Sequence, residues 1–324
     1  MAEVSQSEIE ALSIKALTAH GAAGWVAIEV ARAVARSEAE GNRICGLYYL
    51  ESYCLALQSG RVNGSAEPVV SRPRPGFVAV DGQMGFAQPT FARALPLALV
   101  AARECGTASL AVGHTHTCTS LGYFTRQIAE AGMIALGTTN AAACVAPPGG
   151  RTRVIGTNPV AFAVPDGKGG IAMMFDQSTT VSAMGHITMA RTAGKSIPEG
   201  WAIDAKGLPT TDPQAAIGGS LMSLGGPKGW GFGLMAEILA AGMTGSVLSR
   251  DVSALKSPDG PPHDLGQFYM LIDPGVASGF GDVMAGLAEQ VAKDEGARMP
   301  GQGKVLADPV EVPDDLWALV CALG

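Results

Sequence analysis

The sequence lacks the residue spacings that mark metal and disulfide sites. Its six cysteines include no CxxC pair, and no set of cysteines and histidines has the spacing of a zinc finger. We therefore expect reduced thiols in a cytoplasmic protein with no bound metal. Positive charge is also scarce, because 22 lysines and arginines face 29 acidic residues and the net charge is −7. This balance argues against nucleic acid or an anionic membrane surface as the main partner.

Hydrophobic runs long enough to cross a membrane are absent as well. The opening residues, MAEVSQSEIE, are acidic and contain no apolar segment of a signal peptide. The 324 residues are enough for two domains with a large core. A hydrophobic content of 47% with 43 glycines is typical of a globular enzyme. These features favour a small-molecule substrate and no membrane partner.

Several nucleotide and catalytic motifs are missing. The chain has no GxGxxG after a strand, no GxxxxGK[ST] and no HExxH. A GxSxG nucleophile elbow is also absent. These absences argue against a standard Rossmann fold, a phosphate-binding P-loop, a zinc protease of this kind and an esterase-like hydrolase.

Hydrophobic periodicity predicts a helical subdomain followed by an α/β domain. Apolar faces recur at helical spacing in residues 5–20, 25–39 and 47–59. Short strands and helices then alternate over residues 75–220, and Asp81-Gly82 predicts a tight turn after one of the strands. Further elements are expected at 225–242 (helix), 267–272 (strand), 278–297 (helix) and 313–322 (helix), with a loop-like stretch at 250–266.

The stretch 147–187 has the composition of a ligand site. Two short apolar runs, 160–164 and 171–175, read as buried strands. The second ends at once in the polar residues 176–180, DQSTT. Polar groups at the end of a buried strand must find partners. They form either a turn satisfied within the chain or a floor of donors and acceptors for a ligand.

A second polar segment follows the strand predicted at 109–112. His114 and His116 lie two apart, which places both on one face of a strand and could suit a metal. No third ligand stands near, so a polar pocket or a solvated pair is the better interpretation. The helix that begins after this segment favours phosphate at its amino end. Lys228 begins another helix beside glycines and is either a phosphate contact or a solvated lysine.

Seven collinear segments carry a resemblance to a known family. They are APPGG (146–150), GTNPVAFAVP (156–165), FDQSTTVSAMG (175–185), IPEGWAIDAKGLPTTDPQAA (197–216), GGPKGWGFGLMAEIL (225–239), GQFYMLIDP (266–274) and RMPG (298–301). Together the segments resemble the malate/L-lactate dehydrogenase family of NAD(P)H-dependent oxidoreductases. The segment GHTHTCTSLGYF and the DQSTT box look most like the branch that reduces the cyclic imines Δ1-pyrroline-2-carboxylate and Δ1-piperideine-2-carboxylate.

The resemblance implies an architecture and a set of binding residues. The expected fold is an α/β fold other than the Rossmann fold: a helical domain from both chain ends (1–74 and 225–324) and an α/β NAD(P)-binding domain (75–224) with a large mixed or antiparallel sheet. The implied partner is a second copy in a homodimer, and the cofactor is NADPH or NADH, with NADPH preferred. The implied cofactor positions are His116, Thr117, Cys118, Thr119, Ser120, Asp176, Gln177, Ser178, Pro227, Lys228, Gly301, Gln302 and Gly303. Thr157, Met184 and Gly185 are expected to contact the substrate.

The chain departs from the family at the positions that handle protons. The family pattern is Ser-His-Gly with an arginine four residues after the histidine. This chain has Ile44, Cys45 and Tyr49 at the serine, histidine and arginine positions, and the relay aspartate aligns with His186. Isoleucine relays no proton, and a thiol is a poor acid unless its pKa is tuned.

Two interpretations of this departure remain. In the first, the reaction survives with His186 as the relocated acid, because imidazole titrates near neutral pH, and Cys45 and Tyr49 complete the catalytic wall. Reduction of a protonated imine needs less acid help than reduction of a ketone, which favours the imine branch over a 2-oxo acid or 2-hydroxy acid dehydrogenase. In the second, the chain keeps the dinucleotide pocket as a non-catalytic binding or structural protein. We favour the enzyme, because the cofactor segments are intact.

Overall fold

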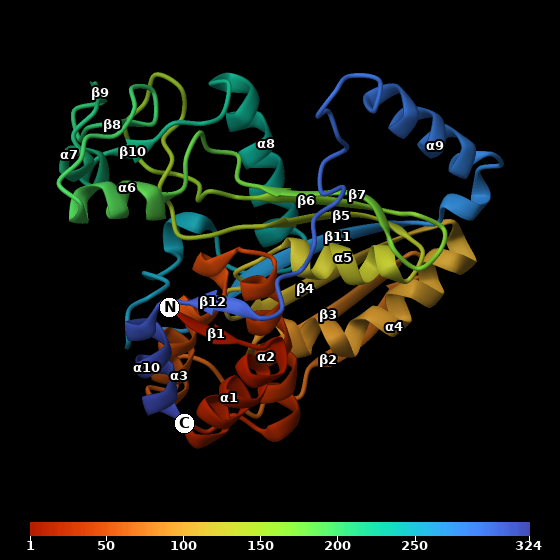
Figure 1. Cartoon of the computed structure of the whole chain (residues 1–324), viewed down its shortest axis with the longest axis horizontal. Helices are drawn as coiled ribbons and strands as arrows, with labels where there is room; N and C mark the ends of the chain where they lie inside the picture. The colour runs from red at the N-terminus through yellow and green to blue at the C-terminus, as the bar shows by residue number, and fades with distance from the viewer.

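A seven-stranded mixed sheet forms the centre of the computed structural model, which describes residues 1–324 (Figure 1). The strands, in spatial order, are β2 (Val69–Arg74), β3 (Phe77–Gly85), β4 (Thr107–Thr115), β11 (Leu265–Ile272), β5 (Ile134–Thr139), β6 (Val160–Pro165) and β7 (Ile171–Gln177). β3 and β4 run parallel, and the other neighbours are antiparallel. This order confirms the predicted non-Rossmann α/β class.

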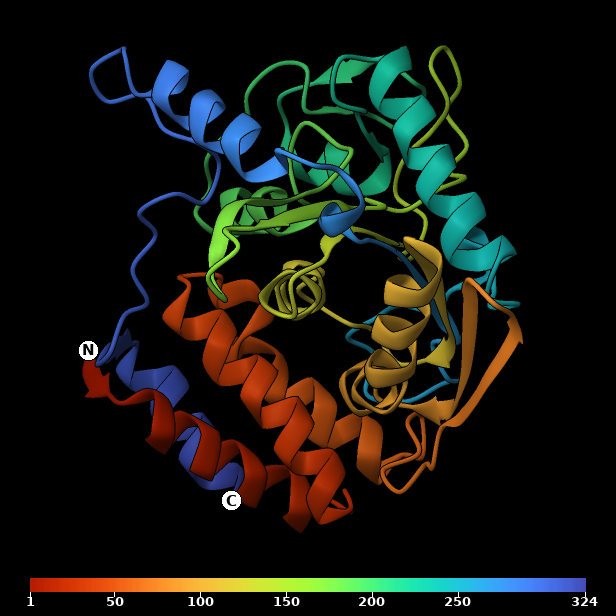
Figure 2. The same ribbon diagram turned by 90° about the vertical axis from the view of Figure 1, so that its right-hand side faces the viewer.

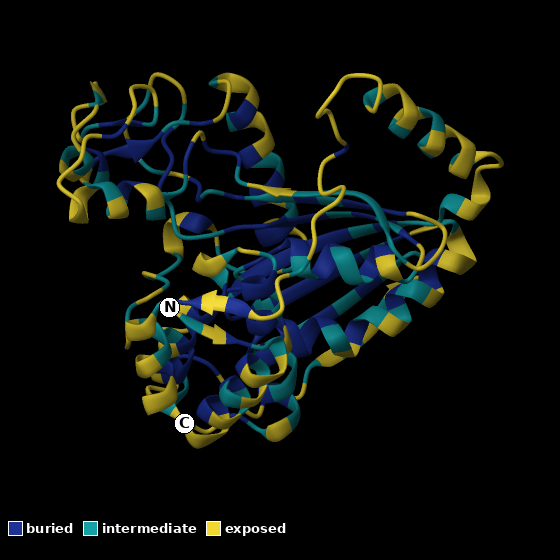
Figure 3. Cartoon of the chain, in the orientation of Figure 1, coloured by how far each residue is buried: buried dark blue, intermediate teal, exposed yellow.

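Helices cover both faces of the sheet. α4 (Ala87–Cys105) and α5 (Gly122–Glu130) pack on one face, where the ring of Tyr269 lies 5.1 Å from that of Phe91. α8 (Pro227–Glu237) and the π-helical turn η3 (Ile238–Gly242) lie on the other face. Gly266 permits this close packing, because a Cβ there would collide with the backbone of η3. Figure 3 shows the sheet as the buried centre of the chain.

The two chain ends build a separate helical layer. Its elements are β1 (Ala2–Val4), α1 (Gln6–Ala19), α2 (Gly24–Ala39), η1 (Arg43–Cys45), η2 (Leu47–Tyr49), α3 (Leu50–Gln58), β12 (Val310–Val312) and α10 (Asp314–Leu323). β1 pairs with β12 and α1 contacts α10, so the first and last segments of the chain lie side by side (Figure 2). Ser5 caps α1 in a reciprocal arrangement with Glu8. None of the helices is both long and apolar enough to span a membrane.

The remaining elements surround the far end of the sheet. A three-stranded sheet of β8 (Ala202–Ile203), β9 (Pro209–Thr210) and β10 (Ser220–Leu221) packs with α6 (Met184–Thr192) and α7 (Pro213–Gly218). The turns η4 (Ser249–Asp251) and η5 (Pro274–Val276) flank β11, and α9 (Phe280–Val291) follows. α9 contains no buried residue and projects away from the sheet (Figure 1).

Two sequence-based expectations differ from the structure. Asp81-Gly82 is not a tight turn but lies inside β3, where a register shift between Asp81 and Gly85 marks a bulge against β4. The range 225–324, expected in the helical domain, contains the central strand β11. β11 is apolar and buried on both faces, which suits the middle of a sheet rather than a helical layer.

Candidate active site

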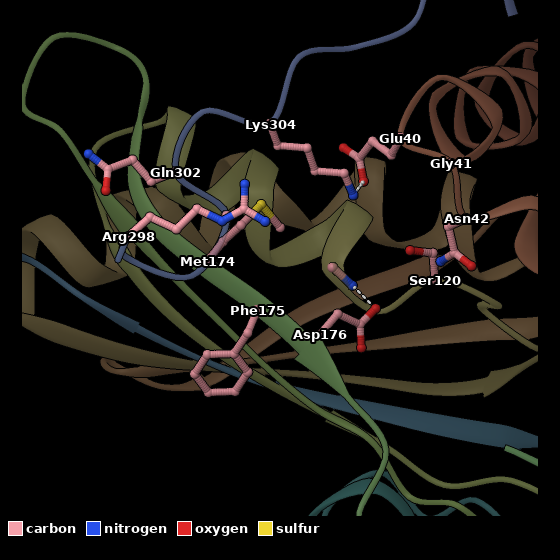
Figure 4. Close-up of a pocket in the computed structure, with 12 residues that line it drawn as sticks. Glu40, Gly41, Asn42, Ser120, Met174, Phe175, Asp176, Arg298, Gln302 and Lys304 are labelled. Carbon is pink, nitrogen blue, oxygen red and sulfur yellow. Dashed lines mark hydrogen bonds and ion pairs between the residues drawn. The ribbon is translucent and has the colours of Figure 1, made fainter. Parts of the chain in front are cut away.

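A cleft of about 630 Å³ opens where β7, the start of α5 and the segment before β12 meet the end of α2. Its lining residues are Glu40, Gly41, Asn42, Ser120, Gly122, Met174, Phe175, Asp176, Arg298, Gly301, Gln302 and Lys304. Figure 4 shows Asn42 and Ser120 beside Asp176, with the segment that carries Arg298 and Lys304 crossing above them. Four of the predicted site residues therefore come together here: Ser120, Asp176, Gly301 and Gln302.

Asp176 ends β7 and faces the first turn of α5. Its Oδ2 accepts a hydrogen bond of 2.7 Å from the backbone N–H of Gly122. The surrounding protein desolvates the carboxyl and raises its pKa to about 6, and the nearby Glu40 adds to the rise while the Gly122 N–H opposes it. The group is still open to the solvent of the cleft. A carboxyl of this kind can accept hydrogen bonds from a ligand amide or hydroxyl.

Arg298, Gly301 and Lys304 form the rim of the cleft opposite Asp176. The Lys304 ammonium lies 4.0 Å from the Glu40 carboxylate, and the two side chains point toward each other in Figure 4. Gly301 has a φ of 77°, and a Cβ there would come within 2.9 Å of the Met174 backbone oxygen. The Pro300 carbonyl accepts a 2.9 Å hydrogen bond from the Met174 N–H. The rim thus lies so close to β7 that Gly301 has no room for a side chain.

Cys45 and Tyr49 form a buried wall next to the cleft. Burial, followed by the charge of Asp176, raises the pKa of the Cys45 thiol to about 12. Burial also raises the pKa of Tyr49 far above its ordinary value. The Tyr49 ring lies 5.5 Å from that of Tyr53, whose hydroxyl lies 3.3 Å from Thr119 Oγ1. Both wall groups are therefore neutral at physiological pH and supply no proton there.

His116 and its neighbours lie behind this wall rather than in the cleft. The His116 ring stacks on His263 at 3.8 Å, and neither of its nitrogens has a hydrogen-bond partner. Burial holds its pKa well below the ordinary value. His114 instead lies 2.8 Å from Asp264, so the two histidines have separate surroundings. Thr117 donates its backbone N–H to His263, and Cys118 is buried.

The other predicted cofactor and substrate residues lie farther from the cleft. Gln177 and Ser178 continue from Asp176, with the Ser178 hydroxyl 3.0 Å from that of Thr180. Gly303 follows the rim in the left-handed conformation, and the Thr157 carbonyl accepts the hydroxyl of Thr179. Pro227 and Lys228 are exposed at the start of α8, next to a second cleft.

His186 lies on α6 outside the Asp176 cleft. Its Nδ1 is 3.3 Å from the Ser182 hydroxyl, and its ring faces Trp201 across a shallow surface depression. The start of α6 nevertheless adjoins the Cys45 wall, because a Cβ on Gly185 would lie 3.5 Å from Ile44. Met184, which begins the helix, is half-buried.

Four charged residues around the cleft were not predicted as site residues: Arg298 of the rim, Glu40, Lys304 and Lys256. Glu40 ends α2, and its carboxylate also lies 3.1 Å from Arg126. Lys304 reaches the cleft from a segment without regular structure. Lys256 lies against the Cys45 wall from the loop before β11. The Glu40-Gly41-Asn42 break after a helix is a signal that could have marked Glu40. Lys256 has no such signal in its surroundings.

Comparison with known proteins gives the family. A match described as malate/L-lactate dehydrogenase covers residues 4–309. The (2R)-3-sulfolactate dehydrogenase (NADP(+)) of Chromohalobacter salexigens is 35% identical over 97% of this chain and 97% of its own. The Δ1-pyrroline-2-carboxylate reductase of Ancylobacter novellus is 35% identical over 99% and 97%. The crystal structure of Δ1-piperideine-2-carboxylate reductase from Pseudomonas syringae matches with a TM-score of 0.93 and 32% identity over 100% of both chains.

The chain belongs to the malate/L-lactate dehydrogenase family. This membership confirms the predicted family and the predicted class of NAD(P)H-dependent oxidoreductase.

Proposed function

We propose that this protein is an NADPH-dependent reductase of a cyclic imine carboxylate. The observation that carries the proposal is the cleft lined by Asp176, Ser120, Arg298 and Lys304, beside a wall of Cys45 and Tyr49 in place of the family's histidine and arginine. Relatives at about one-third identity that are named Δ1-pyrroline-2-carboxylate reductases support this substrate class. The relative named as an NADP(+) enzyme supports the choice of NADPH.

The cleft fits a nicotinamide dinucleotide. Arg298 and Lys304 supply positive charge that can bind phosphate. Gly301 leaves its side of the cleft free of side chain, and Asp176 and Ser120 offer polar groups for an amide or a ribose hydroxyl. NADPH, when bound, supplies a hydride. The chain's own residues hold the two reactants, exclude water and leave the substrate's protonation unchanged.

The wall favours an imine over a ketone as substrate. A protonated imine that gains a hydride becomes a neutral amine, so no further proton is needed during that step. A ketone that gains a hydride becomes an alkoxide, which needs an acid at the same moment. Burial raises the pKa of both Cys45 and Tyr49, so each is a weaker acid than the imidazole that the family uses. The imine therefore suits this site better.

The purified protein is expected to oxidise NADPH with Δ1-pyrroline-2-carboxylate or Δ1-piperideine-2-carboxylate at a kcat/KM at least tenfold above that with pyruvate or 3-sulfopyruvate. The loss of absorbance at the NADPH band measures both. A preference for the 2-oxo acids would make the chain a 2-hydroxy acid dehydrogenase instead. NADPH binding without turnover of any of these compounds would make it a non-catalytic dinucleotide-binding protein.

We propose His186 as the proton donor where one is needed, for a substrate bound between the Asp176 cleft and the start of α6, which adjoins Ile44. Replacing His186 by alanine is expected to lower kcat for a 2-oxo acid at least tenfold, since a positioned general acid contributes about 100-fold or more. Turnover of the imine, which already carries its proton, is expected to change less than threefold. Equal losses on both substrates would show that the ring stabilises α6 rather than donating a proton, and Met189→Ala on the same helix is the matched control.

We further propose a cytoplasmic homodimer. All six cysteines are free thiols, which suits a reducing compartment. Phe232 on α8 is 58% exposed, and Ile238, which begins η3 directly after α8, is 63% exposed. Exposed apolar groups on two consecutive helical segments suit burial against a second copy. Light scattering of the purified protein would give the mass of the assembly.

A further inference from the structure

An ammonium without an acidic partner lies on the wall beside the cleft. Lys256 belongs to the loop between η4 and β11, and its Nζ is 3.2 Å from the centre of the Tyr48 ring and 4.6 Å from that of Tyr49. Its one hydrogen bond is a long contact of 3.5 Å with the Tyr48 carbonyl. It takes part in none of the ion pairs of the structure. The lysine is thus held by aromatic faces and lacks a counter-ion.

A buried arginine holds this loop in place. Arg61 is 1% exposed, and its guanidinium donates to the carbonyls of Pro261 at 3.1 Å and Ala254 at 3.3 Å. It also donates to the carbonyl of Ser257, next to Lys256 in the chain. A buried guanidinium that spends its donors on loop carbonyls fixes the loop's conformation. Lys256 is therefore presented on a rigid support rather than on a free loop.

The charges of Lys256 and Asp176 both affect Cys45, which belongs to the wall beside the cleft. The positive charge of Lys256 lowers the pKa of the Cys45 thiol, and the negative charge of Asp176 raises it. Cys45 is therefore within electrostatic range of both groups, and the lysine and the cleft share this wall. Desolvation lowers the pKa of Lys256 itself to about 8, with the charges of Cys45 and Glu51 opposing the fall. The Lys256 side chain is exposed at the surface, so an incoming anion can reach its ammonium.

We propose that Lys256 is the cation that binds the carboxylate of the substrate. This inference rests on the proposed function of the cleft and adds the source of its specificity. The faces of Tyr48 and Tyr49 hold the ammonium, and the carboxylate of a cyclic imine supplies the missing counter-ion. Lys256 then selects carboxylate-bearing substrates over uncharged imines of the same ring size.

Replacing Lys256 by methionine tests this role, since methionine keeps the length of the stem and removes the charge. We expect KM for Δ1-pyrroline-2-carboxylate to rise at least tenfold with kcat within threefold. KM for uncharged Δ1-pyrroline is expected to stay within twofold. Lys256→Arg should restore most of the affinity. Lys293→Met, which removes an exposed lysine of the segment after α9, is the control and should change nothing.

The outcomes separate this inference from the function on which it rests. Unchanged KM in Lys256→Met, in a wild type that reduces the carboxylate imine, would overturn the role of Lys256 and leave the function standing. A wild type that reduces no imine would overturn the function. Calorimetric binding of pyrrole-2-carboxylate to the NADPH-saturated protein then decides on Lys256: loss of binding in Lys256→Met supports the anchor, and equal binding overturns it.

Discussion

Replacing Asp176 by alanine is expected to lower kcat/KM for NADPH about 100-fold, which corresponds to about 2.7 kcal/mol. The carboxylate faces the proposed cofactor cleft and accepts the N–H of Gly122 at the start of α5. Alanine removes the acceptor that a cofactor amide or hydroxyl would use and leaves that N–H unpaired. Steady-state rates over a range of NADPH concentrations measure the loss.

The same carboxyl predicts a pH dependence with a definite sign. The pKa of Asp176 is raised to about 6. Below that pH the protonated group has one acceptor fewer, so kcat/KM for NADPH in the wild type is expected to rise with pH through about 6 and to level off above 7. Asp176→Asn removes the titrating group, and its profile should lose this step. A step that persists in the variant would assign the titration to another group.

The free energy of unfolding should fall as pH rises, whereas kcat/KM for NADPH rises. Because the pKa of Asp176 in the folded protein lies above the ordinary value of an aspartate, the folded state binds the proton more tightly than the unfolded chain does. This contribution to stability is present at low pH and is lost as pH rises from about 4 to about 6. Asp176→Asn keeps an acceptor for Gly122 and removes the titrating charge, so Tm at pH 7.5 is expected to rise only slightly, because the exposed carboxylate keeps part of its hydration.

A matched aspartate controls for a general charge effect. Asp166 lies in the turn between β6 and β7 and is exposed, and its carboxylate accepts the N–H groups of Lys168 and Gly170. Asp166→Asn is expected to leave kcat/KM for NADPH unchanged. Equal losses of activity in Asp166→Asn and Asp176→Asn would contradict the cofactor role of Asp176.

The sequence predicts the parts of this molecule that depend on local patterns. Apolar runs ending in polar residues identified β7 and placed Asp176 at its end, because a buried strand and its polar terminus are both visible in a short window. The cap of α1 at Ser5 and the helices that follow also depend on residues close together in the sequence. The two-sided burial of β11 is also readable as a continuous apolar run, although its place in the middle of the sheet is not.

The rest of the site depends on contacts between distant segments. Glu40 and Lys304 are 264 positions apart and meet because both chain ends fold into one layer. Lys256 lies in a loop rich in proline and glycine, which has no periodicity from which to infer a position. Its neighbour Tyr48 lies in a predicted helix and carries no functional signal, and Tyr49 stands out only through the family resemblance. Such pairings are set by tertiary packing, which a single sequence does not display.

Replacing Gly301 by valine is expected to raise the Kd for NADPH about 100-fold. The φ of 77° at this position disfavours any side chain, and a β-branched one most of all. A Cβ would also lie 2.9 Å from the Met174 backbone oxygen, and backbone cannot yield as a side-chain tip can. The segment would move off β7 and take Arg298 and Lys304 with it. The cleft would then lose its rim and its positive charge together.

A second glycine separates the steric effect from backbone strain. Gly296 has a φ of 79°, almost the same as Gly301, yet a Cβ there would meet nothing within 4 Å. Gly296→Val carries the same conformational cost and lies outside the cleft, so its Kd for NADPH is expected to stay within twofold of wild type. Fluorescence titration of NADPH measures both variants, and thermal unfolding checks that both fold. Equal weakening in the two would show that the rim acts through chain strain and that the space beside Met174 is not where the cofactor binds.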